Sequence, residues 1–307
     1  MAINTLAYAT LFQQELDRQI VAGATSGWME GNAGLVQYNG GKDIKIPKLT
    51  MDGLGNYDRN LGFTQGASTL VYETKTMTQD RGRTFSLDAM DVNETNFVAN
   101  ASNLMGEFQR TMVIPELDAY RYSTIATLAI AGSKASGGYT PAKADILSRI
   151  KADIASVQDV IGAVPLVITM STATLAILEQ STELTRQLEV GAFSGTILSE
   201  VKKVDECPIV EVPSARLKSA YVFNDGTTAG QVVGGFVPAV GAKSVNWIIC
   251  AASTPIAVSK TDKIRIFTPD QNQTADAFKL DYRKYHDIWV LDNAMATVFV
   301  NCKEALV

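Results

Sequence analysis

The spacing of hydrophobic residues along the chain predicts helices in several places. Apolar side chains recur on one helical face in four segments, which are 6–22, 93–131, 140–161 and 172–180. In the third of these, we expect Thr140 to cap the amino end and Pro141 to take the first helical position. The second is long for a globular protein and contains Pro115 near its middle. That proline predicts one kinked rod, or a second helix that begins at this residue.

The long helix predicted over 93–131 carries a continuous apolar stripe. Before the proline, the stripe consists of Phe97, Ala101, Leu104, Phe108 and Met112. After the proline, it continues through Leu117, Tyr120, Ile125 and Leu128. We expect this stripe to anchor the helix to its own domain, with Phe108 buried in the contact.

Residues 35–88 have the composition of strands and no helical period. Residues 42–46 alternate as a strand that stops at Pro47, and residues 69–77 read as a second strand. The segment between them, 52–68, is rich in Gly, Asn and Asp. The pattern predicts an extended hairpin with a polar tip. Two strands are too thin to bury a core, so such a hairpin needs another surface to lie on.

Shorter strand patterns fill the rest of the chain. They fall at 164–170, 207–212, 219–223, 245–250, 255–259, 263–267, 284–291 and 294–301. Together with the helices they predict an α+β fold, and we find no internal repeat.

Composition places the chain among folded globular proteins. It has 307 residues, of which 46% are apolar and 19% charged. The net charge is −5, from 27 basic and 32 acidic residues without long runs of either sign. Binding to nucleic acid by phosphate neutralisation needs a basic stripe, so the charge balance argues against it. The N-terminus lacks the pattern of a signal peptide. No apolar run is long enough for a transmembrane span. We therefore expect a cytoplasmic protein with no membrane contact.

Candidate catalytic and metal-binding residues are few. Cys207, Cys250 and Cys302 lie far apart in sequence and form no C-x-x-C pair, which favours buried, reduced thiols. His286 is the single histidine and is predicted to be structural, because one histidine cannot build a multi-histidine metal site. The glycines near Lys42 and in 53–58 match neither a phosphate loop nor a dinucleotide fingerprint, and we interpret both as turn glycines.

An acidic cluster precedes and enters the long helix. Asp88, Asp91 and Glu94 could hold a metal ion or form an acid/base pair, but carboxylates at a helix start also complement its dipole, and we favour that interpretation. Arg81 and Arg83 lie just upstream and could pair with these carboxylates within one subunit or across subunits. The sequence therefore predicts no catalytic residue, no cofactor and no metal, and the chain is not expected to be an enzyme.

The order of these elements resembles the Hong Kong-97-type capsid fold of tailed bacteriophages. Short motifs strengthen this resemblance to a phage major capsid protein family found in phages of low-GC Gram-positive hosts. In the first half they are Lys45-Ile-Pro47, Tyr57-Asp-Arg59 followed by Gly62-Phe63, Asp80-Arg-Gly82 with Phe85, Asp88 and Asp91, and Pro115-Glu-x-Asp118-Ala-Tyr-Arg121. Near the C-terminus they are Lys263-Ile-Arg-Ile-Phe267, Pro269-Asp-x-Asn272-Gln, Ala275-Asp-Ala277, Tyr282-Arg-x-Tyr-His-Asp287 and Asp292-Asn293.

The resemblance implies a division of the chain into five parts. These are an N-terminal arm (1–34), an extended β-hairpin loop (35–88), a peripheral domain with the spine helix (89–139), an axial domain (140–255), and C-terminal strands that return to the peripheral domain (256–307). The axial domain is expected to meet its copies at the centres of hexamers and pentamers. The extended loop is expected to lie over a neighbouring subunit, which agrees with a hairpin that has no core of its own.

The resemblance also implies a function. The chain is expected to be a major capsid protein that self-assembles into an icosahedral shell around double-stranded DNA, without sequence-specific DNA binding. Its expected partners are copies of itself, a portal and a scaffold, and decoration proteins are left open. Met1 favours a separate scaffold over a cleaved N-terminal segment. The virion is the expected location, after assembly in the host bacterial cytoplasm. The expected intersubunit contacts are Tyr57, Arg59, Phe63, Arg81 and Arg83.

Two other classes of protein are alternatives to a capsid subunit. An encapsulin-type compartment shell shares the fold and would enclose a cargo protein instead of DNA. A soluble α+β enzyme would need a catalytic cluster, and the sequence offers none.

Overall fold

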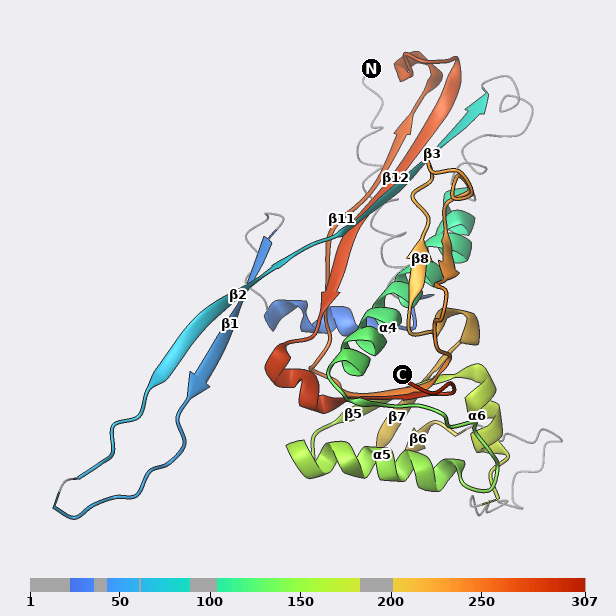
Figure 1. Cartoon of the computed structure of the whole chain (residues 1–307). Coiled ribbons are helices and arrows are strands. Elements are labelled where there is room, and N and C mark those ends of the chain that lie inside the picture. Colours follow the sequence, from blue (N-terminus) through green and yellow to red (C-terminus); the bar gives the residue numbers. More distant parts are fainter. Residues whose placement is uncertain (1–22, 36–42, 61, 89–103, 183–200, 307) are drawn as a thin grey trace, which may run out of the picture.

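The computed structural model describes residues 23–35, 43–60, 62–88, 104–182 and 201–306. It contains both helices and strands, so the predicted α+β class is confirmed. The helix expected over 6–22 and the first part of the one expected over 93–131 lie outside these residues. Figure 1 shows a compact body built on one sheet, a long narrow sheet that rises from it, and a hairpin that projects to one side.

A six-stranded sheet forms the centre of the body. Its order is β4 (Ala135–Ser136), β13 (Val298–Cys302), β10 (Val245–Ala251), β5 (Leu166–Ser171), β7 (Cys207–Val212) and β6 (Lys203–Val204). Trp247 and Ile249 pack with helix α5 (Ile146–Ile161), while Ile248 and Cys250 pack with helix α4 (Ile114–Ala131). Because helices cover both faces, every residue of β5 and β10 is buried, as is typical of continuous apolar strands.

The first turn of α5 differs from the prediction. The helix begins at Ile146, with Asp145 before it, and not at Pro141 after Thr140. The carbonyl of Lys143 accepts a hydrogen bond from the backbone N–H of Thr182. This carbonyl is therefore directed to another segment and takes no part in an earlier helical turn. Helix α6 (Thr172–Glu179) is confirmed, and its N-cap Ser171 accepts from the N–H of Thr174.

The long helix is one continuous rod over the described part, with a local change of pitch. Residues 104–108 are α-helical, Gln109–Val113 form one π-helical turn, and α4 follows from Ile114. The N–H of Ile114 bonds to the carbonyl of Gln109, five residues back. Pro115 has no N–H and crowds the carbonyl four residues before it, so a wider turn at this point accommodates the ring without breaking the helix.

The π-helical turn alters which side chains face the core. Met105, Gln109 and Ile114 are buried, at spacings of four and then five residues. Phe108 is partly buried, as the stripe predicted, but Met112 is 56% exposed. The expectation that Met112 belongs to the anchoring stripe is therefore wrong, because the extra residue in the turn rotates it to the surface.

A narrow three-stranded sheet packs on this helix. Its order is β11 (Ile256–Phe267), β12 (Ala277–Trp289) and β3 (Gln79–Asp88), all antiparallel. The strands expected at 255–259 and 263–267 are in fact one strand, interrupted only by a bulge between Ser259 and Thr261. The polar residues between them hid this continuity in the sequence, yet Lys284 pairs there with Asp262 at 2.6 Å.

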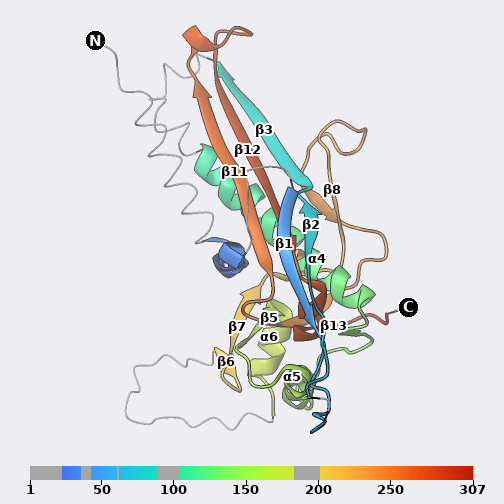
Figure 2. The ribbon, with the colours of Figure 1, turned by 90° about the vertical axis from the view of Figure 1, so that its left-hand side faces the viewer.

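The hairpin consists of β1 (Asp43–Met51) and β2 (Ser68–Thr76), paired over their whole length. The sequence predicts that this strand stops at Pro47, but β1 continues to Met51. A strand at the edge of a sheet can tolerate a residue without an N–H. At the base of the hairpin, Ile46 and Met77 are buried against Ile256 and Trp289 of the long sheet. Figure 2, in which the hairpin faces the viewer, shows it in front of the lower part of that sheet.

Two buried charges on α4 attach the segment before the hairpin. Asp118 is fully buried and accepts hydrogen bonds from the hydroxyls of Thr25 (3.0 Å) and Ser26 (2.7 Å) and from the N–H of Ser26 (3.0 Å). Arg216, in the 3₁₀ turn Ser214–Arg216, reaches the same carboxylate at 3.3 Å. Arg121, also fully buried, donates to the carbonyl of Ser26 (3.1 Å) and pairs with Glu30 (2.5 Å).

Phe108 provides a test of how the helix is anchored. Its ring lies 4.9 Å from that of Phe85 and 5.8 Å from that of Tyr282, both edge-on. Phe108→Ala should lower the free energy of unfolding by about 2–3 kcal/mol, somewhat below the value for a fully buried ring. Met112→Ala, at the exposed position four residues on, should change it by less than about 0.5 kcal/mol. Urea denaturation of the two variants measures both, and equal effects would contradict the assigned packing.

Candidate assembly surface

Large apolar side chains are exposed mainly on the hairpin. Half of the exposed large hydrophobic residues that the structure describes lie between residues 49 and 72. In the antiparallel register, Pro47 is opposite Tyr72, Leu49 opposite Leu70, and Met51 opposite Ser68. Paired residues and every second residue share a face of a strand pair. Pro47, Leu49, Met51, Leu70 and Tyr72 therefore form one continuous exposed surface, which we call the apolar hairpin face.

The opposite face of the hairpin has a different character. Lys48, Thr50, Thr69 and the exposed Val71 alternate with the residues of the apolar hairpin face, and Lys48 pairs with Asp292 of the 3₁₀ helix Asp292–Thr297 at 3.4 Å. The hairpin thus has one apolar face and one mixed face, and no described part of the same chain covers the apolar one. Uncovered apolar strand surface of this kind marks an interaction site or an aggregation hazard.

The tip carries three of the five contact residues predicted from the sequence. Phe63 and Tyr57 are 87% and 61% exposed, and their rings lie 4.9 Å apart. Arg59 is exposed in the turn between them. The turn is closed by two backbone hydrogen bonds between Asp58 and Gly62, whose φ of +81° suits glycine. The structure therefore gathers these residues at the far end of the hairpin, away from the body (Figure 1).

Arg81 has a different environment, inside the subunit. Its guanidinium pairs with Glu116 of α4 and donates to the carbonyls of Asn224 (2.9 Å) and Gly235 (3.3 Å). It also lies over the ring of Phe223, 5.9 Å from its centre. Arg81 thus joins β3 to the spine helix and to the loop around strands β8 (Tyr221–Phe223) and β9 (Phe236–Pro238). A contribution to contacts between subunits remains a prediction for this residue.

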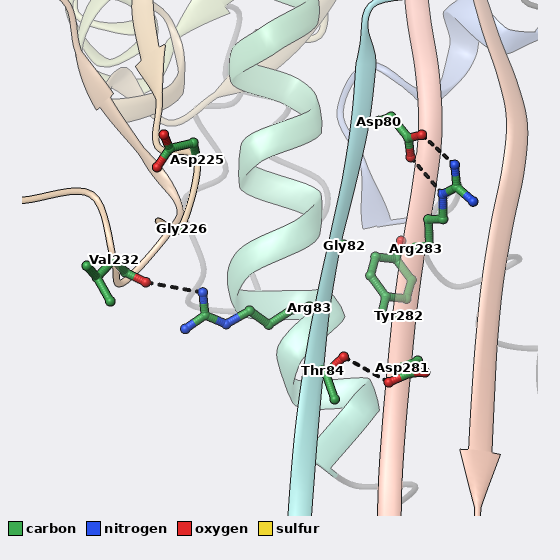
Figure 3. A pocket seen from close by; sticks show the side chains of 10 residues that line it. All are labelled: Asp80, Gly82, Arg83, Thr84, Asp225, Gly226, Val232, Asp281, Tyr282 and Arg283. Atoms are coloured by element: carbon green, nitrogen blue, oxygen red, sulfur yellow. Dashed lines mark hydrogen bonds and ion pairs between the residues drawn. The ribbon is translucent and has the colours of Figure 1, made fainter. Parts of the chain in front are cut away.

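Arg83 borders an open hollow on the same side of β3. The hollow has a volume of about 630 Å³ and lies between β3, β12 and the loop at Asp225–Val232. Figure 3 shows the guanidinium of Arg83 directed to the carbonyl of Val232, at 3.2 Å. Across the sheet, Arg283 pairs with Asp80 at 2.5 Å, and this pairing lowers the pKa of the Asp80 carboxyl. The charges that line the hollow are largely paired with each other or with the backbone.

The acidic cluster expected near the long helix is only partly within the described residues. Asp88 ends strand β3, while Asp91 and Glu94 lie outside them. The glycines near Lys42 also lie outside, whereas Gly53 to Asp58 form part of the exposed hairpin tip and open no helix. Among the described residues there is no group of three His, Cys, Asp or Glu side chains that could hold a metal ion. In the same part of the chain, no helix has the length and apolar character needed to cross a membrane.

The single histidine lies in the core of the subunit and not in a metal-binding cluster of the described residues. His286 is 5% exposed, and its ring contacts that of Tyr120 edge-on at 5.6 Å. Burial, followed by the nearby charges of Lys284, Arg121 and Arg81, lowers its pKa well below the usual value. Its neighbour Asp287 accepts hydrogen bonds from Tyr120 (2.6 Å) and from the N–H of Thr78 (2.7 Å). These residues connect α4, β12 and the start of β3, which is a structural role.

The three cysteines are buried and unpaired. Burial raises the thiol pKa of Cys250 to about 12 and that of Cys302 to about 11, and it also raises that of Cys207. Thiols in such surroundings are protonated and unreactive at neutral pH.

Comparison with solved structures identifies the fold. The chain is similar to the mature capsid of bacteriophage PhiM1 (TM-score 0.57, 12% identity, 86% of this chain and 82% of that chain) and to the capsid of cyanophage P-SCSP1u (0.58, 11%, 85% and 83%). It is also similar to a virus-like particle from Pyrococcus furiosus (0.52, 10%, 96% and 99%). No protein-family model and no curated protein matches the sequence.

These similarities extend over most of the chain at low sequence identity. They confirm the predicted fold class, so the protein has the Hong Kong-97-type capsid fold of tailed phages. The hairpin β1–β2 lies within residues 35–88, for which the sequence predicts an extended loop.

His286 gives a clear pH dependence to test. Its folded-state pKa is depressed below the unfolded value of about 6.5, so its contribution to stability is present above that pH and is lost as the pH falls. Between about pH 7.5 and about pH 5.5, the free energy of unfolding should fall by roughly 1.4 kcal/mol. His286→Phe keeps a ring against Tyr120 and should remove most of this slope. Denaturation of the subunit at the two pH values measures it, and an equal slope in both proteins would contradict the assignment.

Proposed function

We propose that this chain is a major capsid protein, the structural subunit that self-assembles into the icosahedral head shell around phage double-stranded DNA. The observation that supports this most is the apolar hairpin face. It extends from a subunit with a capsid fold and has no described surface of its own chain to cover it. Burial against neighbours in a shell would cover it.

The contacts between subunits follow from this proposal. Tyr57, Arg59 and Phe63 would contact an adjacent subunit at the hairpin tip, since aromatic and arginine side chains dominate interface energetics. Arg83 would contribute beside the open hollow. Arg81 would act mainly by holding β3 of the narrow three-stranded sheet against the spine helix, and secondarily at the interface.

The domain reading assigns a place in the shell to each part. Residues 140–255, which contain α5 and most of the six-stranded sheet, would be the axial domain. Residues 89–139 and 256–307 would form the peripheral domain, with 1–34 as an N-terminal arm and 35–88 as the extended loop. Strand β3, at the end of that loop, pairs with β12 and so attaches it firmly to the peripheral domain.

The proposed partners are copies of the same chain in hexamers and pentamers, together with a separate scaffold and a portal. Packaged DNA would lie inside without sequence-specific binding, which a net charge of −5 favours. The role is structural and not enzymatic. The protein would assemble in the host bacterial cytoplasm and end in the virion.

Assembly itself is the first test. Expression of the chain, with a scaffold if needed, should give closed particles in sedimentation and electron microscopy. A protein that stays monomeric under every assembly condition would contradict the proposed function.

An encapsulin-type compartment shell is the second candidate. The similarity to the virus-like particle from Pyrococcus furiosus spans nearly all of both chains. It supports this second candidate beside the phage capsid. Electron micrographs of particles from the native source distinguish the two functions. A DNA-filled head with a portal supports the capsid, and a closed shell that holds protein supports the compartment.

Replacement of the hairpin tip separates folding from assembly. The described residues of the tip, 52–60 and 62–67, are exposed except for the half-buried Gly62, so a short Gly-Ser turn in place of 52–67 should leave circular dichroism and melting of the subunit unchanged. Particle formation should be lost or the shells should become fragile. Val160→Ser, at an exposed position on α5, serves as the control and should assemble normally.

Shells of normal stability from the shortened chain would show that the tip is not a contact between subunits. Failure of the shortened subunit to fold would place these residues in the subunit core.

A further inference from the structure

A second strand pair exposes apolar side chains, and it lies far from the hairpin in sequence. Residues 219–243 leave the body between β7 and β10 and return to it, and we call them the β8–β9 ribbon. Its ends are held together by the N–H of Ser219 bonded to the carbonyl of Lys243 (2.9 Å) and by that of Val245 bonded to Leu217 (3.2 Å). Strands β8 and β9 pair so that Val222 is opposite Val237 and Phe223 opposite Phe236.

The β8–β9 ribbon carries apolar side chains on both of its sides. Phe223 packs edge-on against Tyr120 of α4 at 5.5 Å, and the ring of Tyr221 lies 5.3 Å from that of Phe236. These aromatic residues form the side toward the spine helix. The valines alternate with them in the strands and therefore face away.

Exposed valines cover the outer side of this ribbon and its ends. Val233 is 90% exposed, and the other members are Val222, Val232, Val237 and Val240, all classed as exposed. We call these five residues the valine face. Together with the apolar hairpin face and the hairpin tip, they account for nearly all large apolar side chains exposed in the described part of the chain. The remaining ones are Val71, on the other face of the hairpin, and Met112, Val160 and Ile266, which are separate from both.

The two faces lie on different sides of the subunit. In Figure 1 the hairpin extends to the left of the body, while β8 lies in front of α4. In Figure 2, which is viewed from that left side, the hairpin points toward the viewer and the loop at β8 projects to the right. Within one subunit the two faces remain apart, and both are exposed.

The symmetry of a ring adds a requirement. In a ring of five or six copies, each contact joins two different surfaces of the chain, because only a twofold contact joins a surface to itself. The apolar hairpin face must then meet another patch on the neighbour. The valine face is the other apolar cluster in the described residues, and it lies on a different side of the subunit, as a head-to-tail contact requires.

We propose that the apolar hairpin face of one subunit packs on the valine face of the next subunit around the ring. This inference rests on the proposed shell function and assigns the partner surface that the hairpin needs. The occupant is a second copy of this chain. Contact buries both uncovered apolar strips and leaves the other face of the hairpin, where Lys48 pairs with Asp292 of the same chain, at the surface.

Site-specific crosslinking in assembled particles tests the pairing. The natural cysteines are buried, so new surface thiols react selectively. The double variant Met51→Cys with Val233→Cys, treated with a short bifunctional thiol reagent, should give covalent oligomers up to pentamers and hexamers. The control pairs Met51→Cys with Val160→Cys, which is exposed on α5, and should remain monomeric on a denaturing gel.

The outcomes separate this pairing from the shell function. Particles that form without the Met51–Val233 crosslink overturn the pairing and leave the shell function standing. Crosslinking of Met51→Cys alone would show that two hairpins pack on each other, which also overturns it. Absence of particles for the unmodified chain counts against the shell function itself.

Hydrogen exchange on the unmodified protein covers the case in which the cysteine variants fail to assemble. On passing from subunit to particle, peptides that span 68–72 and 232–240 should both become protected. If either segment exchanges as fast in the particle as in the subunit, the pairing is wrong.

Discussion

The structure depends on two charges that are buried on one helix. Asp118 and Arg121 lie one turn apart on α4 and are both fully buried, so neither can be hydrated. Their partners come from the segment at Thr25–Glu30 and from Arg216, which lies just after strand β7 of the central sheet. Removing one partner of such a buried set leaves an uncompensated charge, at a cost of about 3–5 kcal/mol. Helix α4 therefore holds both the segment at Thr25–Glu30 and the turn at Arg216 in one fixed position.

The same helix also determines where the assembly surfaces lie. One side of α4 packs on the six-stranded sheet, the preceding turns support the narrow sheet, and Tyr120 contacts the β8–β9 ribbon. Glu116 holds Arg81, and through it β3, which follows the hairpin directly in the chain. The hairpin and the ribbon are thus supported by one rigid element on two different sides. A shift of that element would move both surfaces together.

Much of the secondary structure can be predicted from local sequence patterns. Features that depend on contacts between residues far apart in the sequence cannot. The hairpin, α6 and the buried strands β5 and β10 were found because their spacing and composition are local signals. The continuity of β11 was missed because its charged middle is neutralised by Lys284 on another strand. The placement of Arg81 inside the subunit depends on Glu116 and on carbonyls more than a hundred residues away. The apolar hairpin face could be recognised only from the register, which sequence spacing alone does not specify.

The π-helical turn before Pro115 has a consequence for how the chain can change in length. In a regular α-helix, loss of one residue rotates everything beyond it by about 100°, which would turn a packed face into solvent. In Gln109–Val113 the buried positions are already separated by one residue more than a regular helix provides. Deletion of a residue there restores the ordinary pitch and leaves Met105 and Ile114 on the same side. Within the described part of the spine helix, this is where an insertion or deletion can be absorbed in evolution without repacking either end.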